Sequence, residues 1–505
     1  AVEQFVEALQ RRGVEWMATL CGHGLDPLFH AAKAAGLRLV DTRNEQTAGY
    51  IADYFGRLTR RPGVCAVSSA VAHANALTGV VNAWFDGSPM LLISGAAAVR
   101  TAGMGHFQDM DQVAMARPVT KYARVIDHPD RAAQIVEEAL DVAMVEPQGP
   151  VHLTFPMDIQ RAEADHPVVR TPIAAPVFHE DMDAAAEAIA AAERPLVVAG
   201  SGVWYANEGA ALIACCERLR IPFVVPIWDR GVVEKPSPAF AGIQGALSGA
   251  PGFFERADCV VMAGAISDYR VGYLQHGARV VRLTRGWAEL DRRLTPTPAH
   301  AAWLEEVLIR RDEFRHSVEE KARQQGAGGT HALDILNALR RVLSDDALLL
   351  IDGGSVGQWA HHLLTDRYPS HWLTCGRSGV VGWGLAGAMA ARLARPESPV
   401  VLLAGDGAFT FNVAELECAA RQGLHFVAIV ADDLGWGITR TGHIRQFGEP
   451  ISSSLGPVKF DQLAESLGAR GAVAASREEI EPKLRWALEQ KAVTVLHVPI
   501  VGGNP

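Results

Sequence analysis

Residues 405–437 read GDGAFTFNVAELECAARQGLHFVAIVADDLGWG, and this stretch decides the fold. The apolar run just before it, residues 400–404, is typical of a buried parallel strand. A helix with an apolar face follows and closes at Gly423, and residues 425–431 predict a second buried strand. Strand–helix–strand units cross over right-handed, so both strands are expected to end at the same edge of one sheet.

Two carboxylates stand at the ends of these two strands. Asp406 lies between two glycines directly after the first strand, and Asp433 follows the second. Open α/β sheets bind ligands at this edge, and glycine lets the backbone come close to a ligand. Oxygen ligands beside exposed amides suit Mg²⁺ chelated by a diphosphate. The alternative is an acidic surface pair that merely ends a strand.

The composition is that of a folded protein with several domains. At 505 residues the chain is too long for one core, and it is 49% hydrophobic and 21% charged. A net charge of −10 without a basic cluster argues against nucleic acid and anionic membranes as partners. No apolar run reaches membrane-spanning length, and residues 1–20 predict an amphipathic helix and a strand, not a signal peptide. Seven scattered cysteines favour the cytoplasm and argue against zinc.

Three α/β blocks are predicted, at residues 1–165, 183–310 and 331–505. In each block short apolar runs alternate with helical stretches, which predicts doubly wound parallel sheets. Besides the two strands above, the predicted strands are residues 37–40, 64–68, 90–93, 151–155, 196–199, 223–226, 259–263, 280–283, 348–351 and 493–498. Residues 161–178 and 312–330 are predicted linkers. The first and third blocks have similar sizes and strand numbers, which is compatible with duplicated folds.

The stretch 405–437 resembles the thiamine diphosphate binding motif, in which a Gly-Asp-Gly is followed after a fixed gap by an asparagine-rich turn. By this resemblance Asp406, Asp433 and the carbonyl of Gly435 hold the metal. The resemblance also assigns cofactor binding to Gly405, Gly407 and Ala408. The family usually has Asn-Asn where this chain has Asp432-Asp433, so negative charge is added beside a diphosphate.

A second motif lies in the first block. Residues 41–57, DTRNEQTAGYIADYFGR, are similar to the family's glutamate motif, in which an acidic residue precedes a helix. The resemblance implies that Glu45 hydrogen-bonds ring nitrogen N1′ of the cofactor and favours the imino tautomer that removes the C2 proton. The alternative is a glutamate that only favours the helix N-terminal dipole.

Three further segments resemble acetolactate synthase-like members of this family. Residues 73–95 match a stretch that implies a cofactor contact for Asn75, although Ala70-Val71-Ala72 replaces the usual G-P-G before it. Residues 106–122 imply that Gln108 faces the reacting centre and holds a substrate oxygen, the alternative being a loop cap. Residues 376–389 imply that Val381 bends the cofactor and that the Gly379 carbonyl accepts from its 4′-amino group, the alternative being an ordinary glycine-rich helix start. Residues 352–355 are expected to line the diphosphate pocket.

The resemblance implies three doubly wound domains (PYR, central and PP) and a lyase or carboligase that depends on thiamine diphosphate and Mg²⁺. Its substrate would be a 2-keto acid or 2-hydroxy ketone, and the reaction would pass through a C2 carbanion and an enamine. His23, in the unusual loop 20–29, could relay protons to a substrate, and His73 is a weaker candidate. The alternatives are an enzyme like 2-hydroxyacyl-CoA lyase or oxalyl-CoA decarboxylase, and a cofactor-binding homologue without turnover.

The middle block resembles the domain that binds FAD in acetolactate synthase. Ile266 replaces an expected arginine, and residues 282–285, RLTR, replace an acidic strand end, so FAD is not expected. The chain stops at Pro505, soon after the last strand, which lowers the expectation of a CoA substrate and leaves the loop 441–454 as a possible closure. Family usage implies a homodimer or homotetramer, in which Glu45 and Asp406 of one active site come from different subunits.

Overall fold

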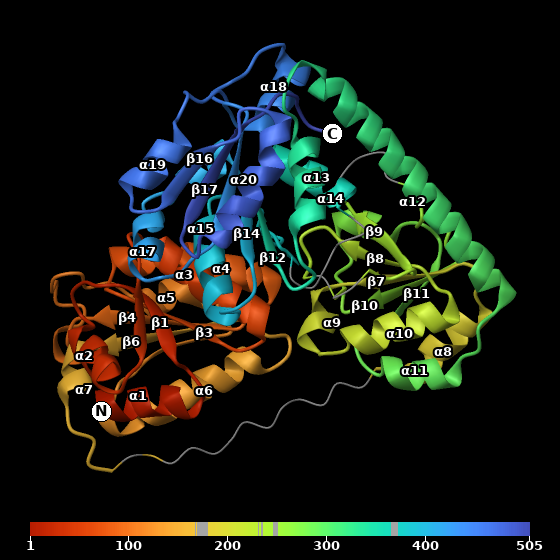
Figure 1. The fold of residues 1–505 in the computed structure, drawn as a ribbon. Helices are drawn as coiled ribbons and strands as arrows, with labels where there is room; N and C mark the ends of the chain where they lie inside the picture. Colours follow the sequence, from red (N-terminus) through yellow and green to blue (C-terminus); the bar gives the residue numbers. More distant parts are fainter. Residues whose placement is uncertain (167, 169–179, 231, 234–235, 246–250, 365–371) are drawn as a thin grey trace. The chain divides into compact units, whose positions relative to one another are not determined.

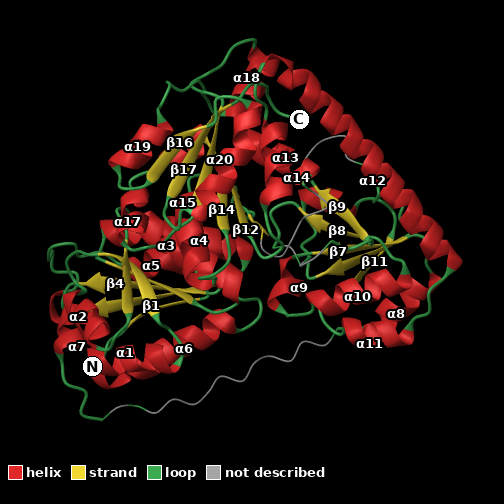
Figure 2. Ribbon diagram, viewed as in Figure 1, coloured by secondary structure: helices red, strands yellow, loops and turns green. Residues whose placement is uncertain are grey.

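The structure is a computed structural model that describes residues 1–166, 168, 180–230, 232–233, 236–245, 251–364 and 372–505. Its strands form three parallel sheets with helices packed against them (Figures 1 and 2). The chain forms two compact units. One contains residues 1–177, 375–397 and 411–425, and the other contains residues 178–374, 398–410 and 426–505.

The first sheet has the strand order β2-β1-β3-β4-β6-β5. Its strands are β1 (Trp16–Leu20), β2 (Arg38–Asp41), β3 (Gly63–Val67), β4 (Met90–Ala96), β5 (Tyr122–Val125) and β6 (Pro150–Pro156). Its helices are α1 (Val2–Arg11), α2 (Asp26–Ala34), α3 (Glu45–Thr59), α4 (Val71–Asp86), α5 (Gln112–Ala116), α6 (Ala132–Met144) and α7 (Met157–Arg161). Helices α1 and α6 pack together on one face of the sheet, and α3 and α4 pack together on the other (Figure 1).

The third sheet has the order β13-β12-β14-β15-β17-β16. Its strands are β12 (Leu348–Asp352), β13 (Trp372–Leu373), β14 (Val400–Gly405), β15 (Val427–Asp432), β16 (Arg470–Val473) and β17 (Thr494–Pro499). The helices of the same unit are α13 (Ala332–Val342), α14 (Gly354–Leu363), α16 (Asp406–Thr410), α18 (Gly437–Phe447), α19 (Phe460–Ser466) and α20 (Arg477–Glu489). Numbered from its own first strand, the third sheet repeats the order of the first sheet. Two helices of this part of the sequence, α15 (Gly384–Ala394) and α17 (Glu415–Arg421), belong to the unit of the first sheet.

The central sheet has the order β11-β10-β7-β8-β9, which is the classic doubly wound arrangement with the first strand in the middle. Its strands are β7 (Pro195–Ala199), β8 (Phe223–Pro226), β9 (Phe240–Gln244), β10 (Cys259–Ala263) and β11 (Arg279–Arg282). The accompanying helices are α8 (Met182–Ala191), α9 (Ser201–Tyr205), α10 (Gly209–Leu219) and α11 (Trp287–Arg293). The sequence prediction did not include β9.

The predicted linker at residues 312–330 is wrong, because most of it lies in the long helix α12 (Pro298–Gln325). Its Glu, Lys, Arg, Ala and Gln residues are strong helix formers, although their polarity favoured a loop. Val318 and Ala322 are buried in the core, while Arg323 and Glu319 pair 3.2 Å apart on the helix surface. The predicted closing loop 441–454 is also helical as far as Phe447 in α18.

Two other expectations concern the chain's course. Of the predicted linker 161–178, residue 167 and residues 169–178 lie outside the described residues. The helix and strand expected within residues 1–20 are present as α1 and β1. Across the described ranges, no helix combines the length and apolar character needed to cross a membrane.

Candidate active site

Glu45 is the first residue of α3, directly after the carboxyl end of β2. Asn44 caps the helix, because its side-chain oxygen accepts a hydrogen bond of 2.9 Å from the backbone nitrogen of Gln46. The Asn75 side chain on α4 donates to Glu45 Oε2 at 2.7 Å and to Asn44 Oδ1 at 2.8 Å. The structure therefore brings Glu45 and Asn75 together and fixes the half-buried carboxylate through an amide.

A second glutamate, Glu415 at the start of α17, was not among the predicted site residues. Its two carboxylate oxygens accept hydrogen bonds of 2.9 and 3.1 Å from the backbone nitrogen of Arg43, and its side chain is 1% exposed. Burial raises the pKa of Glu415 to about 7, although the Arg43 hydrogen bond opposes this. Glu415 thus fixes the turn that leads into Glu45. In the sequence, the one signal that could have identified Glu415 was its charge within a helix predicted to have an apolar face.

Gln108 lies beyond the carboxyl end of β4 with a backbone φ of +57°, a region that non-glycine residues rarely occupy. The Ser69 hydroxyl, just after β3, donates to Gln108 Oε1 at 2.8 Å. Because its oxygen already accepts from Ser69, the amide nitrogen of Gln108 is the atom that can donate to a substrate oxygen. Strain at a residue held by a specific contact is a common feature of functional sites.

His23 is exposed and belongs to the same edge as Gln108. Its ring lies 5.6 Å from the Phe107 ring, and its carbonyl accepts a hydrogen bond of 2.5 Å from the Ser68 hydroxyl. His73, in contrast, is fully buried, with its ring 4.6 Å from that of His152. Burial lowers the pKa of His73 to about 4, so this side chain stays neutral and away from solvent.

The turn that replaces the usual G-P-G keeps a glycine-like backbone without a glycine. Ala70 has φ +54° and ψ −104°, and its backbone nitrogen donates to Gln112 Oε1 at 2.9 Å. Such a conformation costs about 1–3 kcal/mol and persists only where the surroundings impose it. Gln112 also donates to the Gly95 carbonyl at 2.8 Å, so it ties this turn to the end of β4.

The glycine-rich segment 376–382 packs in the same unit as Glu45. The Ser378 hydroxyl hydrogen-bonds Asn82 on α4, seven residues beyond Asn75. Residues seven apart lie two helical turns apart on one face, roughly 10 Å along the axis. Gly379 has φ +68° and open space where a side chain would begin, while Val381 is half-buried. Glu45 and Ser378 thus contact the same face of α4, through Asn75 and Asn82.

In the other unit, Asp406 and Asp433 meet at the carboxyl edge of the third sheet. Gly405 of β14 pairs with Ala431 of β15, and Asp406 Oδ2 accepts a hydrogen bond of 2.9 Å from the Gly435 backbone nitrogen. Asp406 is 4% exposed, and burial together with the charge of Asp433 raises its pKa to about 7. A divalent cation held by both carboxylates would relieve this repulsion.

Each carboxylate of the unusual Asp432-Asp433 pair has its own partner. Asp433 Oδ2 lies 3.2 Å from the Arg440 guanidinium on α18, and Asp432 Oδ2 lies 2.9 Å from His497 Nε2. Burial raises the pKa of Asp433. Burial also opposes ionisation of Asp432, but the hydrogen bonds from His497 and the Leu434 nitrogen and the charge of His497 together lower its pKa. Asp432 also accepts from the Leu434 backbone nitrogen, so it stabilises the turn that carries Asp433.

Two of the glycines around these carboxylates are packed too closely to carry a side chain, and a third faces open space. A Cβ atom on Gly407 would lie 2.9 Å from the Trp436 ring, and one on Gly353, which has φ +123°, would lie 2.8 Å from the Gly405 nitrogen. Gly405 itself faces open space. No group of three or more His, Cys, Asp or Glu side chains able to hold a metal occurs in the described part of the chain. Two carboxylates and a carbonyl fit Mg²⁺ that takes its other ligands from diphosphate and water.

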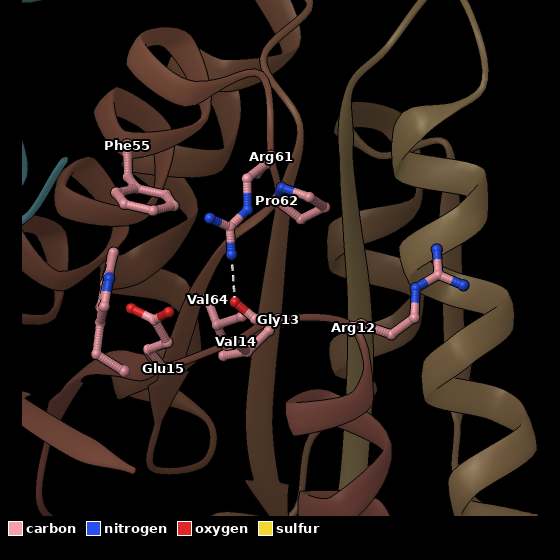
Figure 3. A pocket seen from close by; sticks show the side chains of 9 residues that line it. Arg12, Gly13, Val14, Glu15, Phe55, Arg61, Pro62 and Val64 are labelled. Carbon is pink, nitrogen blue, oxygen red and sulfur yellow. Dashed lines mark hydrogen bonds between the residues drawn. The ribbon is translucent and has the colours of Figure 1, made fainter.

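Two hollows lined by described residues differ in their relation to the predicted site residues. A hollow of about 590 Å³ lies beside the carboxyl ends of β4 and β6 and is lined by Gln108, Gln112 and Thr154 among others. A smaller hollow of about 50 Å³ lies at the opposite edge of the sheet, where β1 and β3 begin (Figure 3). Trp16, Phe55 and Arg61 line it, and it contains no predicted site residue.

Comparison with known proteins identifies the class of protein that this fold and site define. The thiamine pyrophosphate enzyme family matches in all its parts: the N-terminal TPP binding domain at residues 1–115, the central domain at 182–308 and the C-terminal TPP binding domain at 352–498. The chain therefore belongs to the thiamine diphosphate-dependent enzymes of the acetolactate synthase-like superfamily, and it is a lyase or carboligase of that class. The predicted family resemblance and fold class are confirmed.

Several relatives match over nearly the whole chain. A probable acetolactate synthase of Mycobacterium bovis is 29% identical over 97% of this chain and 94% of its own length. Human 2-hydroxyacyl-CoA lyase 2 is 27% identical over 98% of this chain and 87% of its own length. The large subunit of acetolactate synthase isozyme 1 of Escherichia coli is 25% identical over 99% of this chain and 93% of its own length.

Proposed function

We propose that this protein uses thiamine diphosphate and Mg²⁺ to make or break a carbon–carbon bond beside the carbonyl of a 2-keto acid or 2-hydroxy ketone. The observation that carries the proposal is the close pair of carboxylates Asp406, which is buried, and Asp433, at the edge of a sheet matched by the C-terminal TPP binding domain. When bound, the cofactor supplies a nucleophilic carbon, C2, that attacks a carbonyl.

At the edge of the third sheet, Asp406, Asp433 and the Gly435 carbonyl would hold Mg²⁺. The backbone of Gly405, Gly407 and Ala408 would contact the diphosphate. The close fit of Gly407 beneath Trp436 supports this assignment, because any side chain there would displace the turn that carries Asp433. Arg440 supports it too, since it offsets the charge that an aspartate adds where the family has asparagine.

At the edge of the first sheet, Glu45 would hold a proton shared with the pyrimidine ring, and the Gly379 carbonyl would accept from the amino group. Val381 would press the two rings together. The Gln108 amide would donate to a substrate carboxylate or carbonyl oxygen. His23 would move a proton at the substrate hydroxyl oxygen, a role supported by its exposure beside the loop of Gln108.

We also propose that the active unit is at least a homodimer, with the first-sheet edge of one subunit and the third-sheet edge of another acting on one cofactor. Exposed apolar side chains support association through the first unit. Val71, Met104 and Phe107 are 73%, 75% and 67% exposed, although all three are large and apolar. Apolar surface of this kind commonly marks a protein–protein interface. Sedimentation of the purified protein would distinguish dimer from tetramer.

The central domain is proposed to hold no FAD. Arg270, on the segment after β10, is buried and pairs with Asp229 at 2.6 Å and with Asp268 at 2.9 Å. A Cβ atom on Gly200 would lie 2.6 Å from the Gly264 carbonyl oxygen, so the turns after β7 and β10 touch each other. The chain's own side chains thus fill part of the edge that a nucleotide would need. A yellow protein with nearly stoichiometric flavin would contradict this.

The substrate is tested by assaying pyruvate with and without an aldehyde acceptor, with CO₂ and acyloins as the measured products. Release of CO₂ with acyloin formation would support the acetolactate synthase-like activity. The alternative is cleavage of a 2-hydroxyacyl-CoA, which is favoured by the similarity to human 2-hydroxyacyl-CoA lyase 2. Aldehyde release from such a thioester, with no reaction of pyruvate, would support that alternative.

A further inference from the structure

The last residues of the chain lie along the carboxyl edge of the third sheet. After β17, Val501 donates its backbone N–H to the Thr330 carbonyl at 2.8 Å, and Gly503 donates to Gln325 Oε1 at 2.7 Å. The indole nitrogen of Trp359 donates to the Gly503 carbonyl at 2.8 Å. Residues 501–504, here termed the C-terminal strap, are thus tied to the end of α12 and to α14.

Asn504 extends the strap to the first turns of two helices. Its side-chain oxygen accepts a hydrogen bond from the Ser355 hydroxyl at the start of α14. Its side-chain nitrogen lies 3.4 Å from the Ile438 carbonyl at the start of α18, and its own carbonyl accepts from Gln325 Nε2 at 3.2 Å. One neutral side chain therefore joins α14 to α18.

These two helix starts border the proposed metal and diphosphate site. A Cβ atom on Gly437 would lie 2.7 Å from Ser355 Oγ and still closer to Asp433 Oδ2. A Cβ atom on Gly354 would lie 2.5 Å from Ile438 Cδ1. The contacts are continuous from Asn504 through Ser355 and Gly437 to Asp433, with no space for another side chain.

We propose that Asn504 is a positioning residue for the diphosphate and Mg²⁺, acting through the Ser355 hydroxyl and the start of α18. The inference rests on the proposed function, since it assigns the strap to that cofactor site. A neutral amide suits this place, because a carboxylate would add charge beside the diphosphate and a lysine would compete with the metal. Groups that orient metal or cofactor ligands in this way typically change affinity by about 10–100-fold.

The test is calorimetric titration of the full-length protein, with Mg²⁺ present, using thiamine diphosphate and inorganic pyrophosphate as separate probes. Asn504→Ala is expected to weaken binding of both probes about tenfold. Ser355→Ala should weaken both similarly, and the double variant should lose little more, because the two residues act through one hydrogen bond. Unchanged or tighter binding by Asn504→Ala would overturn the inference, and tighter binding would show that the strap competes with the cofactor.

Two further variants keep the result interpretable. Gln490→Ala removes an amide that bonds Arg470 and the Trp486 carbonyl where β16 begins, at the opposite edge of the same sheet, so binding should not change. Gln325→Ala loosens the strap at its other anchor and should weaken both probes a few-fold, even if Asn504→Ala fails to fold. A wild-type protein that binds neither probe would refute the proposed function, whereas normal wild-type binding that none of the strap variants weakens would refute the strap inference alone.

Discussion

The carboxyl edges of the first and third sheets share one plan and differ in charge. In both sheets a residue after the fourth strand is hydrogen-bonded to a residue after the third. In the first sheet the Ser69 hydroxyl donates to Gln108 at 2.8 Å, and in the third the Gly435 nitrogen donates to Asp406 at 2.9 Å. The repeated strand order provides the repeated arrangement.

The side chains at these equivalent places give the two edges different chemistry. The carboxyl edge of the first sheet (the first edge) has amides, hydroxyls and a glutamate that is hydrogen-bonded by Asn75. These groups suit hydrogen bonding to a cofactor ring and a substrate. The carboxyl edge of the third sheet has a buried carboxylate, Asp406, and a partly buried one, Asp433, among glycines, which suit a metal and a diphosphate. Topology thus sets where ligands bind, and residue type sets what is bound.

The largest expected effect separates activation from binding. Glu45→Gln should slow hydrogen–deuterium exchange at C2 of bound thiamine diphosphate by about 10²–10⁴-fold, because the amide cannot share the proton in the same way. Cofactor affinity should change little, since we propose that the carboxyl edge of the third sheet binds the diphosphate. Exchange would be followed by proton NMR after acid quench, with Glu137→Gln on α6 as the control. Unchanged exchange would show that another acid activates the cofactor.

The next largest effect is expected for the carboxylates at the carboxyl edge of the third sheet. Asp406→Asn should weaken Mg²⁺-dependent cofactor binding by about 100-fold, because it removes a charged ligand. Asp432→Asn is the matched control, since Asp432 is engaged with His497 and the Leu434 nitrogen. Its effect should stay below about tenfold. Equal losses of cofactor affinity in the two variants would mean that the metal ligands are wrongly assigned.

A third prediction concerns the buried carboxyl of the first unit. The pKa of Glu415 is raised by burial to about 7 from its ordinary 4.5, so the folded protein binds this proton more tightly than the unfolded chain. The contribution of Glu415 to the free energy of unfolding therefore falls by roughly 2–3 kcal/mol as pH rises from about 4.5 to 7, and it stays low at higher pH. Glu415→Gln should remove this dependence. Denaturant unfolding of both proteins between pH 5 and 8 would show it, and parallel profiles would contradict it.

The smallest effect tests the paired contact at the first edge. Gln108→Ala should lower kcat/KM about tenfold at unchanged cofactor affinity, the size of one neutral hydrogen bond to substrate. Ser69 only orients Gln108, so Ser69→Ala should lower kcat/KM less. Steady-state kinetics of both variants decide the matter, and a larger loss for Ser69→Ala would assign the substrate contact to the serine.

The sequence predicted most of the buried strands and the edge strands β2 and β11, but it missed the edge strands β5, β9, β13 and β16. Strands β3, β14 and β15 are buried along nearly their whole length, so continuous apolar runs mark them. Strands β5 and β16 are half-exposed, and only two described residues belong to β13, so these strands lack that pattern. Helix α12 was interpreted as a linker because its exposed residues are charged.

The candidate site shows the same division between local and distant information. Asp406, Asp433 and Glu45 lie in short motifs whose spacing is visible in the sequence. The contact of Glu415 with Arg43 joins residues 372 positions apart, and that of Ser355 with Asn504 spans 149. Neither belongs to a local pattern. The partners of the Asp432-Asp433 pair, His497 and Arg440, likewise become visible only in the folded chain.

The most direct measurement is calorimetric titration of thiamine diphosphate into the full-length protein, first with Mg²⁺ and then with EDTA in its place. A cofactor site formed by the carboxyl edges of the first and third sheets predicts saturable binding of one cofactor per chain with Mg²⁺. It also predicts a large loss of affinity with EDTA. No uptake under either condition, or the same affinity without the metal, would contradict it.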